Sequence, residues 1–191
     1  WDLMAKRANL PVYALAAQMA GKSATAPYEV PCYDTSLYID DLHLGDDAGA
    51  AALIAEEARE GWARGHRAFK LKVGRGARHM PLEAGTQRDI EVIYAVREAV
   101  GKDAPLMLDA NNGYNLNLTK RILLETAECN IFWMEEAFHE DRVLYDDLQV
   151  WLSREGITTL IADGEGQASP TLLEWAEAGL VNVVQYDIFS Y

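Results

Sequence analysis

The sequence has only two cysteines among 191 residues, Cys32 and Cys129, which is too few for a disulfide framework. Both stand in apolar stretches, so we expect both to be buried and reduced. Basic residues are also scarce, because 17 Lys and Arg stand against 30 Asp and Glu, a net charge of −13. A polyanion would be repelled by this charge, which argues against nucleic acid as a partner.

Long hydrophobic runs are missing as well. No apolar run approaches the roughly 18 residues of a membrane-spanning helix, and no charged-then-apolar leader opens the chain. We therefore expect a cytoplasmic protein without a membrane partner. The start on Trp1, inside a helical pattern, leads us to expect that the chain is part of a longer protein.

A regular alternation of strand and helix patterns is present. Parallel strands need helical crossovers, so this alternation predicts a parallel α/β sheet. A doubly wound sheet would carry a phosphate-binding glycine turn after its first strand, and none is found there. We expect strands over 30–39, 68–73, 131–134, 158–162 and 181–187 and one ending at Asp109, and helices over 48–64, 82–100, 117–128, 142–154 and 170–178, the last with Ser169 as its N-cap.

The favoured fold class is an α/β barrel of the TIM type that is cut short after about six βα units. A complete eight-fold barrel takes roughly 250 residues, more than this chain has. Residues 1–29 are expected to form a helical lead-in segment, and residues 30–191 the partial barrel, a metal-binding catalytic domain.

Three acids stand at the ends of three successive strands. Asp109, Glu135 and Glu165 follow one another at intervals of 26 and 30 residues, and the ends of consecutive barrel strands are neighbours. Carboxylates so close would repel each other, and a bound Mg²⁺ would remove this conflict. Neighbouring residues on a strand point to opposite sides, so we assign the ligand to Glu135 rather than to Glu136. The alternative is that these acids are solvated loop residues or helix caps.

Lys70 and Lys72 lie two positions apart and should share one face of their strand. A lysine that faces inward beside a cation is less stable as an ammonium, so its pKa should fall and it can accept a proton from carbon. Alternatives are lysines that protect a solvated edge strand, or a Schiff-base aldolase, which leaves the acids unexplained. The following basic loop, with Arg75, Arg78 and His79, is expected to be solvated or else to approach an acidic substrate.

Lys-x-Lys, Asp-x-Asn, Glu-Glu and Gly-Glu, in this order at strand ends, resemble the enolase superfamily of the mandelate racemase/muconate lactonising type. The resemblance runs from Trp1 to the last residue. It implies a (β/α)₇β barrel with a separate capping domain, which this sequence lacks. Two departures are Ala137 and Tyr186, which stand where the family usually has proline.

The resemblance also implies roles for individual residues. Lys72 would be the catalytic base, and Lys70 would tune its charge and contact the substrate carboxylate. Asn111 would lie near the metal or the substrate. Asp187 would support a histidine on a seventh strand, which is not in this sequence. The Mg²⁺ ligands would be Asp109, Glu135 and Glu165.

The reaction that the resemblance implies is removal of the proton α to a carboxylate through a Mg²⁺-stabilised enediolate. We expect a lyase that dehydrates a sugar acid, and a homo-oligomer whose partner is a small carboxylate substrate. A racemase, epimerase or cycloisomerase of the same superfamily is the alternative. A non-catalytic metal-binding fragment is a further one.

Overall fold

The computed structural model describes residues 1–23, 29–166 and 168–186, and the chain divides into two units, Trp1–Cys32 and Tyr33–Tyr191. The first unit holds two short helices, α1 (Asp2–Ala8) and α2 (Val12–Met19). Asn9 ends α1 in the left-handed backbone conformation, and Pro11 stands directly before α2. None of the helices in the described ranges is long and apolar enough to cross a membrane.

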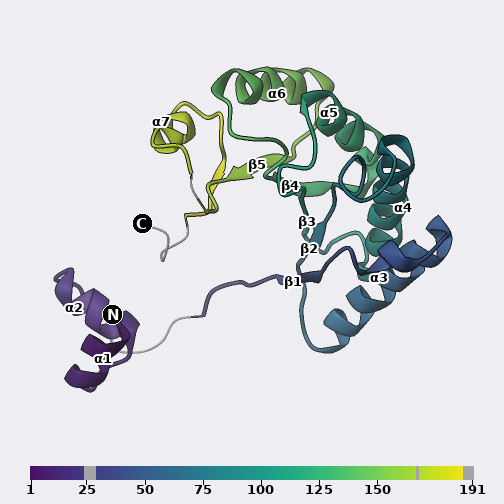
Figure 1. Ribbon diagram of the computed structural model, residues 1–191. Helices are drawn as coiled ribbons and strands as arrows, with labels where there is room; N and C mark the ends of the chain where they lie inside the picture. The colour runs from purple at the N-terminus through teal and green to yellow at the C-terminus, as the bar shows by residue number, and fades with distance from the viewer. Residues whose placement is uncertain (24–28, 167, 187–191) are drawn as a thin grey trace. The chain divides into compact units, whose positions relative to one another are not determined.

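The second unit is built on a parallel sheet of six strands that follow one another in chain order. Within this unit the strands form an arc, and helices α3 to α6 lie along its outer side (Figure 1). The strands β1 and β6 form the two edges of the sheet. The strands are β1 (Asp34–Leu37), β2 (Phe69–Lys72), β3 (Leu106–Asp109), β4 (Ile131–Glu135), β5 (Leu160–Asp163) and β6 (Val183–Val184).

Most helices form where their apolar period and their caps predict them. Helix α4 spans Leu82–Val100 and ends at Gly101, as expected. Gly156 closes α6 in the left-handed conformation that glycine adopts at low cost. The remaining helices are the 3₁₀ segment η1 (Asp40–His43), α3 (Asp47–Ala63), α5 (Leu116–Glu125), the 3₁₀ segment η2 (Ala127–Cys129), α6 (Arg142–Glu155) and α7 (Leu172–Glu177).

Some boundaries differ from the sequence prediction. The expected strand over 30–39 shortens to β1, and within β1 the Asp34 carboxylate accepts a hydrogen bond from Ser36 N and the register with β2 shifts. Thr171 instead of Ser169 is the N-cap of α7, and the Ser169 hydroxyl, two residues earlier, accepts a hydrogen bond from Thr171 N. The last strand was expected to reach Asp187, which lies outside the described residues.

The two faces of the sheet carry different side chains. The main core lies between the outer face and the helices, where Leu71 and Leu108 pack with Ile93 and Leu148. The inner face holds a smaller apolar cluster of Met107, Trp133 and Ala162. Because side chains alternate along a strand, Lys70, Asp109 and Glu135 share the inner face with this cluster.

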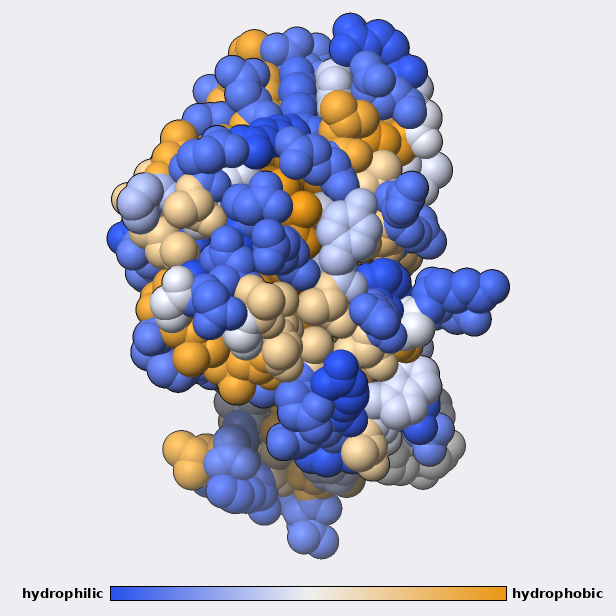
Figure 2. Space-filling view, turned by 90° about the vertical axis from the view of Figure 1, so that its right-hand side faces the viewer, coloured by the Kyte–Doolittle hydropathy of each residue, from blue (hydrophilic) through white to orange (hydrophobic). Residues whose placement is uncertain are grey.

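The outer helical surface is mostly polar. Seen from the side on which α3 and α4 lie in Figure 1, hydrophilic residues cover most of the surface, with apolar ones between them (Figure 2).

Cys129 is buried, as predicted, but Cys32 is exposed, so the prediction is wrong for this cysteine. Residues 29–33 belong to no helix or strand, which leaves Cys32 without a packed layer over it.

Candidate active site

The strand ends bring the predicted acids together. In the sheet register Lys72 stands beside Asp109, and Asp109 beside Glu135. Asp109 and Glu135 are completely buried, and Glu165 follows β5 in an exposed position. One carboxylate oxygen from each of the three acids lies within 4.8 Å of the other two. Asp109 and Glu135 are too deeply buried to be solvated loop acids, and the arrangement of the three acids matches the geometry expected of a metal site.

Both lysines point to these acids. Lys70 Nζ lies 2.6 Å from Glu135 Oε1 and 3.1 Å from Asp109 Oδ2. Lys72 Nζ lies 2.5 Å from Asp109 Oδ2 and 2.8 Å from Asn111 Oδ1. The alternative of solvated lysines on an edge strand is wrong, because β2 lies between β1 and β3 and Lys70 is 6% exposed.

The buried charges shift the pKa values of their neighbours. Burial, followed by the charge of Asp109, raises the pKa of Glu135 to about 7, although Lys70 opposes the shift. Burial alone would lower the pKa of Lys70, but its hydrogen bond to Glu135 and the charges of Asp109 and Glu135 raise it above the ordinary value. The lowered pKa was expected of a lysine beside a bound cation, and that expectation stays a prediction. In the chain alone the two carboxylates outweigh burial at Lys70, so the pKa of Lys70 shifts upward.

Glu135 and Glu136 play different structural parts. Glu135 belongs to the group of converging acids, whereas Glu136 turns away with a positive φ of 42°. The Glu136 carboxylate accepts a hydrogen bond of 2.9 Å from Asn111 Nδ2. Asn111 thus contacts both Lys72 and Glu136, which joins the loops after β3 and β4.

Sequence reasoning missed a buried ionic network behind Lys72. Arg75 is completely buried and donates to the carboxylates of Asp41 and Asp89. Its Nη1 also donates to the carbonyl oxygen of Lys72, and Tyr114 Oη donates to Asp89. The expectation of a solvated or substrate-facing Arg75 is wrong, because these acids come from η1 and α4. Arg78 and His79 are exposed, as predicted.

Two further residues near the acids were not singled out. Asp163 ends β5, is buried and accepts from Tyr145 Oη, and burial raises its pKa. Gln185 donates to Glu135, and its Oε1 is buried with no hydrogen-bond partner among the described residues. The position of Asp163 at a strand end was the available signal. No such signal marked Gln185, since a single glutamine after a short strand is not distinctive.

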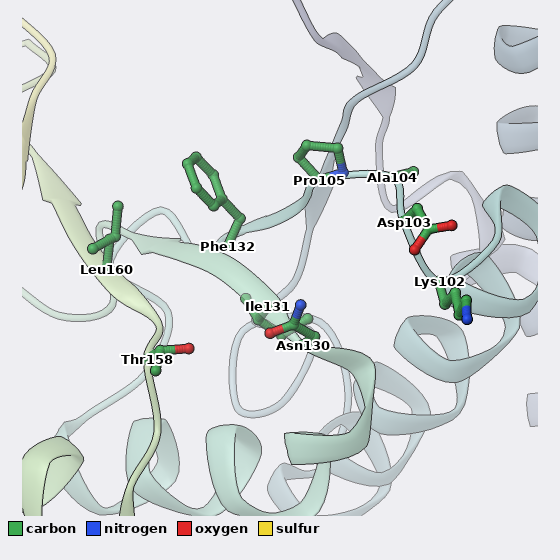
Figure 3. A pocket seen from close by; sticks show the side chains of 9 residues that line it. All are labelled: Lys102, Asp103, Ala104, Pro105, Asn130, Ile131, Phe132, Thr158 and Leu160. Carbon is green, nitrogen blue, oxygen red and sulfur yellow. The ribbon is translucent and has the colours of Figure 1, made fainter.

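Asp187, the remaining predicted site residue, lies outside the described residues. At the C-terminal ends of the strands, one hollow is lined by four acids, an amide and a histidine: Asn112, Glu136, His139, Glu140, Asp163 and Glu165. A different cavity, of about 470 Å³, lies at the opposite ends of β3, β4 and β5 (Figure 3). Phe132, Pro105 and Leu160 line it, away from the converging acids.

Comparisons with known proteins agree with this architecture. The family model of enolase C-terminal domain-like proteins matches residues 53–190. A solved galacturonate dehydratase from Geobacillus sp., in complex with D-galacturonate and 5-keto-4-deoxy-D-galacturonate, is 59% identical, with a TM-score of 0.82 over 83% of this chain and 43% of its own. A variant of that enzyme was solved with Mg.

Curated relatives cover several reactions. The L-talarate/galactarate dehydratase of Salmonella typhimurium is 33% identical over 71% of this chain and 29% of its own length. The hydrophobic dipeptide epimerase of Enterococcus faecalis is 29% identical over 100% of this chain and 46% of its own length. Cycloisomerases are also among the relatives.

The chain spans less than half of the length of each of these relatives. Their barrel fold confirms the predicted fold class, here as a parallel sheet of six strands with its helices. The family model covers most of the chain, and the strand-end acids and lysines stand in the order that the family resemblance requires. The chain therefore belongs to the enolase C-terminal domain-like family, among its mandelate racemase/muconate lactonising members.

Proposed function

We propose that the protein carrying this chain dehydrates a sugar acid, and specifically a hexuronate such as D-galacturonate, in a Mg²⁺-dependent reaction. The observation that carries the proposal is the convergence of three carboxylates and two lysine ammonium groups at one end of the sheet. The likeness to a galacturonate dehydratase that is 59% identical supports the choice of substrate.

Asp109, Glu135 and Glu165 would hold the metal. The donor set suits Mg²⁺, which prefers oxygen ligands. Burial, followed by the charge of Asp109, raises the pKa of Glu135, and a bound cation would stabilise its charged form. Gln185 Oε1, which has no hydrogen-bond partner among the described residues, offers a further acceptor for a bound water. When bound, the ion would stabilise the negative charge that develops on the substrate carboxylate as its α-proton leaves.

Lys72 would act as the base. Its Nζ is held by Asp109 and Asn111 at the mouth of the strands, while Lys70 lies two positions deeper and is tied to Glu135. The outer lysine can therefore reach a substrate at the mouth, and the inner one supplies positive charge to its carboxylate. Lys70 is buried and Lys72 is half-buried, and both contact the acids that would hold the metal.

The proposed reaction breaks the C–H bond next to the carboxylate, and Lys72 takes the proton. The electron pair forms a double bond to the neighbouring carbon, whose C–O bond breaks, and the hydroxyl leaves with a proton as water. The enol that remains becomes a ketone, the type of product named for the Geobacillus enzyme. The role of Asp187 beside a histidine stays a prediction, as does the homo-oligomer.

The test is incubation of the whole protein that contains this sequence with D-galacturonate and Mg²⁺. We expect 5-keto-4-deoxy product by NMR, and no product with the Lys72→Ala variant. A panel of other sugar acids extends the substrate search. If no sugar acid loses water although the chain binds Mg²⁺, the dehydratase proposal is wrong.

Racemisation or epimerisation is the second candidate, because a dipeptide epimerase matches the chain over its whole length. This reaction would exchange the α-proton with solvent and leave every hydroxyl in place. Incubation in D₂O separates the two candidates, since an epimerase gives α-deuterated substrate without loss of water.

A further inference from the structure

Asn111 sits between a group that can only donate hydrogen bonds and a group that can only accept them. Lys72 Nζ donates to Asn111 Oδ1 at 2.8 Å, and Asn111 Nδ2 donates to Glu136 Oε2 at 2.9 Å. An ammonium has no acceptor and a carboxylate has no donor. Only one orientation of the Asn111 amide satisfies both neighbours, with its carbonyl oxygen toward Lys72.

The backbone keeps these groups in register. Asn111 N donates to Asp109 Oδ1 at 3.1 Å, and Asn112 N donates to the carbonyl oxygen of Glu136 at 2.7 Å. Glu136 N donates in turn to the carbonyl oxygen of Ala162. Asn111, Asn112 and Glu136 all have positive φ, which is uncommon for residues other than glycine. Such strained backbone conformations persist where surrounding contacts hold them. Here this backbone conformation directs the Glu136 carboxylate toward Asn111.

We propose that Glu136 is a positioning residue for Lys72, acting through the Asn111 side chain. This inference rests on the proposed function, in which Lys72 is the base. The neutral amine has two N–H groups and one lone pair. Asn111 Oδ1 and Asp109 Oδ2 stand where they accept both N–H groups, and the lone pair is then confined to the one remaining tetrahedral direction. Without Glu136 the Asn111 amide can rotate and release this constraint.

The paired variants Glu136→Ala and Glu136→Gln separate positioning from charge. Gln keeps an oxygen that can accept from Asn111 but has no charge, whereas Ala removes the acceptor. We expect kcat of Glu136→Ala to fall about 100-fold with KM within a few-fold of wild type, since small displacements of catalytic groups have effects of this size. Glu136→Gln should keep kcat within a few-fold. A raised KM with unchanged kcat would instead mean that Glu136 binds substrate, and would overturn the proposal.

A double-mutant comparison tests the path through Asn111. If Glu136 acts only through Asn111, Glu136→Ala should have little further effect on kcat in the Asn111→Ala background. Independent, multiplying losses would contradict the proposed path. Circular dichroism of each variant checks that it is folded.

A readout that needs no turnover comes from the side-chain amide of Asn111 in ¹⁵N NMR spectra of the chain. The amide protons should exchange slowly with water in wild type and in Glu136→Gln, and rapidly in Glu136→Ala. Equal exchange in all three would refute the contact-based mechanism. If wild type turns over no sugar acid, the proposed function fails, whereas an active wild type with an equally active Glu136→Ala refutes only the positioning role.

Discussion

Replacing Arg75 by Met tests whether the buried ionic network behind the candidate site holds the fold together. Arg75 Nη2 lies 2.6 Å from Asp41 Oδ1, and Nη1 lies 2.8 Å from Asp89 Oδ1, with all three side chains inaccessible to solvent or nearly so. Met has a similar stem but no charge. The variant therefore keeps most of the packing and leaves two buried carboxylates without their main partner.

The expected cost follows from this loss. Removing one partner of a buried ion pair costs about 3–5 kcal/mol, because the charge left behind is poorly solvated. Among the described residues, Asp41 keeps the more distant Arg88, at 3.7 Å, and Asp89 keeps Tyr114 and two backbone N–H groups. With a urea dependence of about 2 kcal/mol/M, a loss of about 3 kcal/mol lowers the unfolding midpoint by about 1.5 M.

Urea denaturation followed by circular dichroism measures this shift. Arg121→Met is the control, since Arg121 pairs with Glu83 and Glu125 at the surface, and its midpoint should hardly change. The pH dependence of stability gives a second test. Burial raises the pKa of Asp89 even with Arg75 present, so the Asp89 carboxylate binds a proton more readily in the folded state than in the unfolded state. Lowering the pH toward the ordinary range of the carboxyl therefore favours the folded state, more strongly in the variant. The account would be refuted if Arg75→Met lowered the free energy of unfolding by less than about 1 kcal/mol, or if the stability difference from wild type grew at low pH.

Three further predictions concern the metal and the base. Asp109→Asn should lose most of the Mg²⁺ affinity in calorimetry, whereas Glu136→Gln should keep it; unchanged binding in Asp109→Asn would rule out the ligand assignment. Because the pKa of Glu135 is raised to about 7, protons should compete with Mg²⁺ below that pH, so the affinity should fall as pH drops through 7 and should not do so in Glu135→Gln. In D₂O the whole protein should exchange the α-proton of its substrate, and Lys72→Ala should not; exchange retained by Lys72→Ala would move the base to another group.

Residue pattern alone predicted the elements that bury one regular face. Helix α4 matches its predicted bounds, because its apolar residues recur at the helical period and Gly101 stops it. The convergence of Asp109 and Glu135 also followed from pattern, since both end buried parallel strands. The bounds of the short strands β1 and β6 did not follow from pattern, because these are the edge strands and each pairs with a single neighbouring strand.

Contacts between distant segments explain what the pattern did not predict. The Gly74-Arg75-Gly76 stretch has the composition of an exposed loop. Arg75 can be buried because its charge is paired with Asp41 and Asp89, which come from distant parts of the chain. One signal was available, because Asp89 lies four and seven positions before Ile93 and Val96, on the face of α4 that is buried. An acid on a buried helix face requires a partner such as a cationic side chain. The sequence alone does not identify which side chain this is.

Contacts with acids also explain why Lys70 and Lys72 suit different roles although they share one face of β2. Lys70 lies among Glu135 and Asp109 with 8% of its side chain exposed, so its charge is fixed by two acids. Lys72 contacts one acid and one neutral amide, and 13% of its side chain is exposed. A proton acceptor must be able to exist as a neutral amine, and one contacting carboxylate opposes that state less than two do. The contacts thus favour Lys72 as the base and leave Lys70 as a permanent cation beside it.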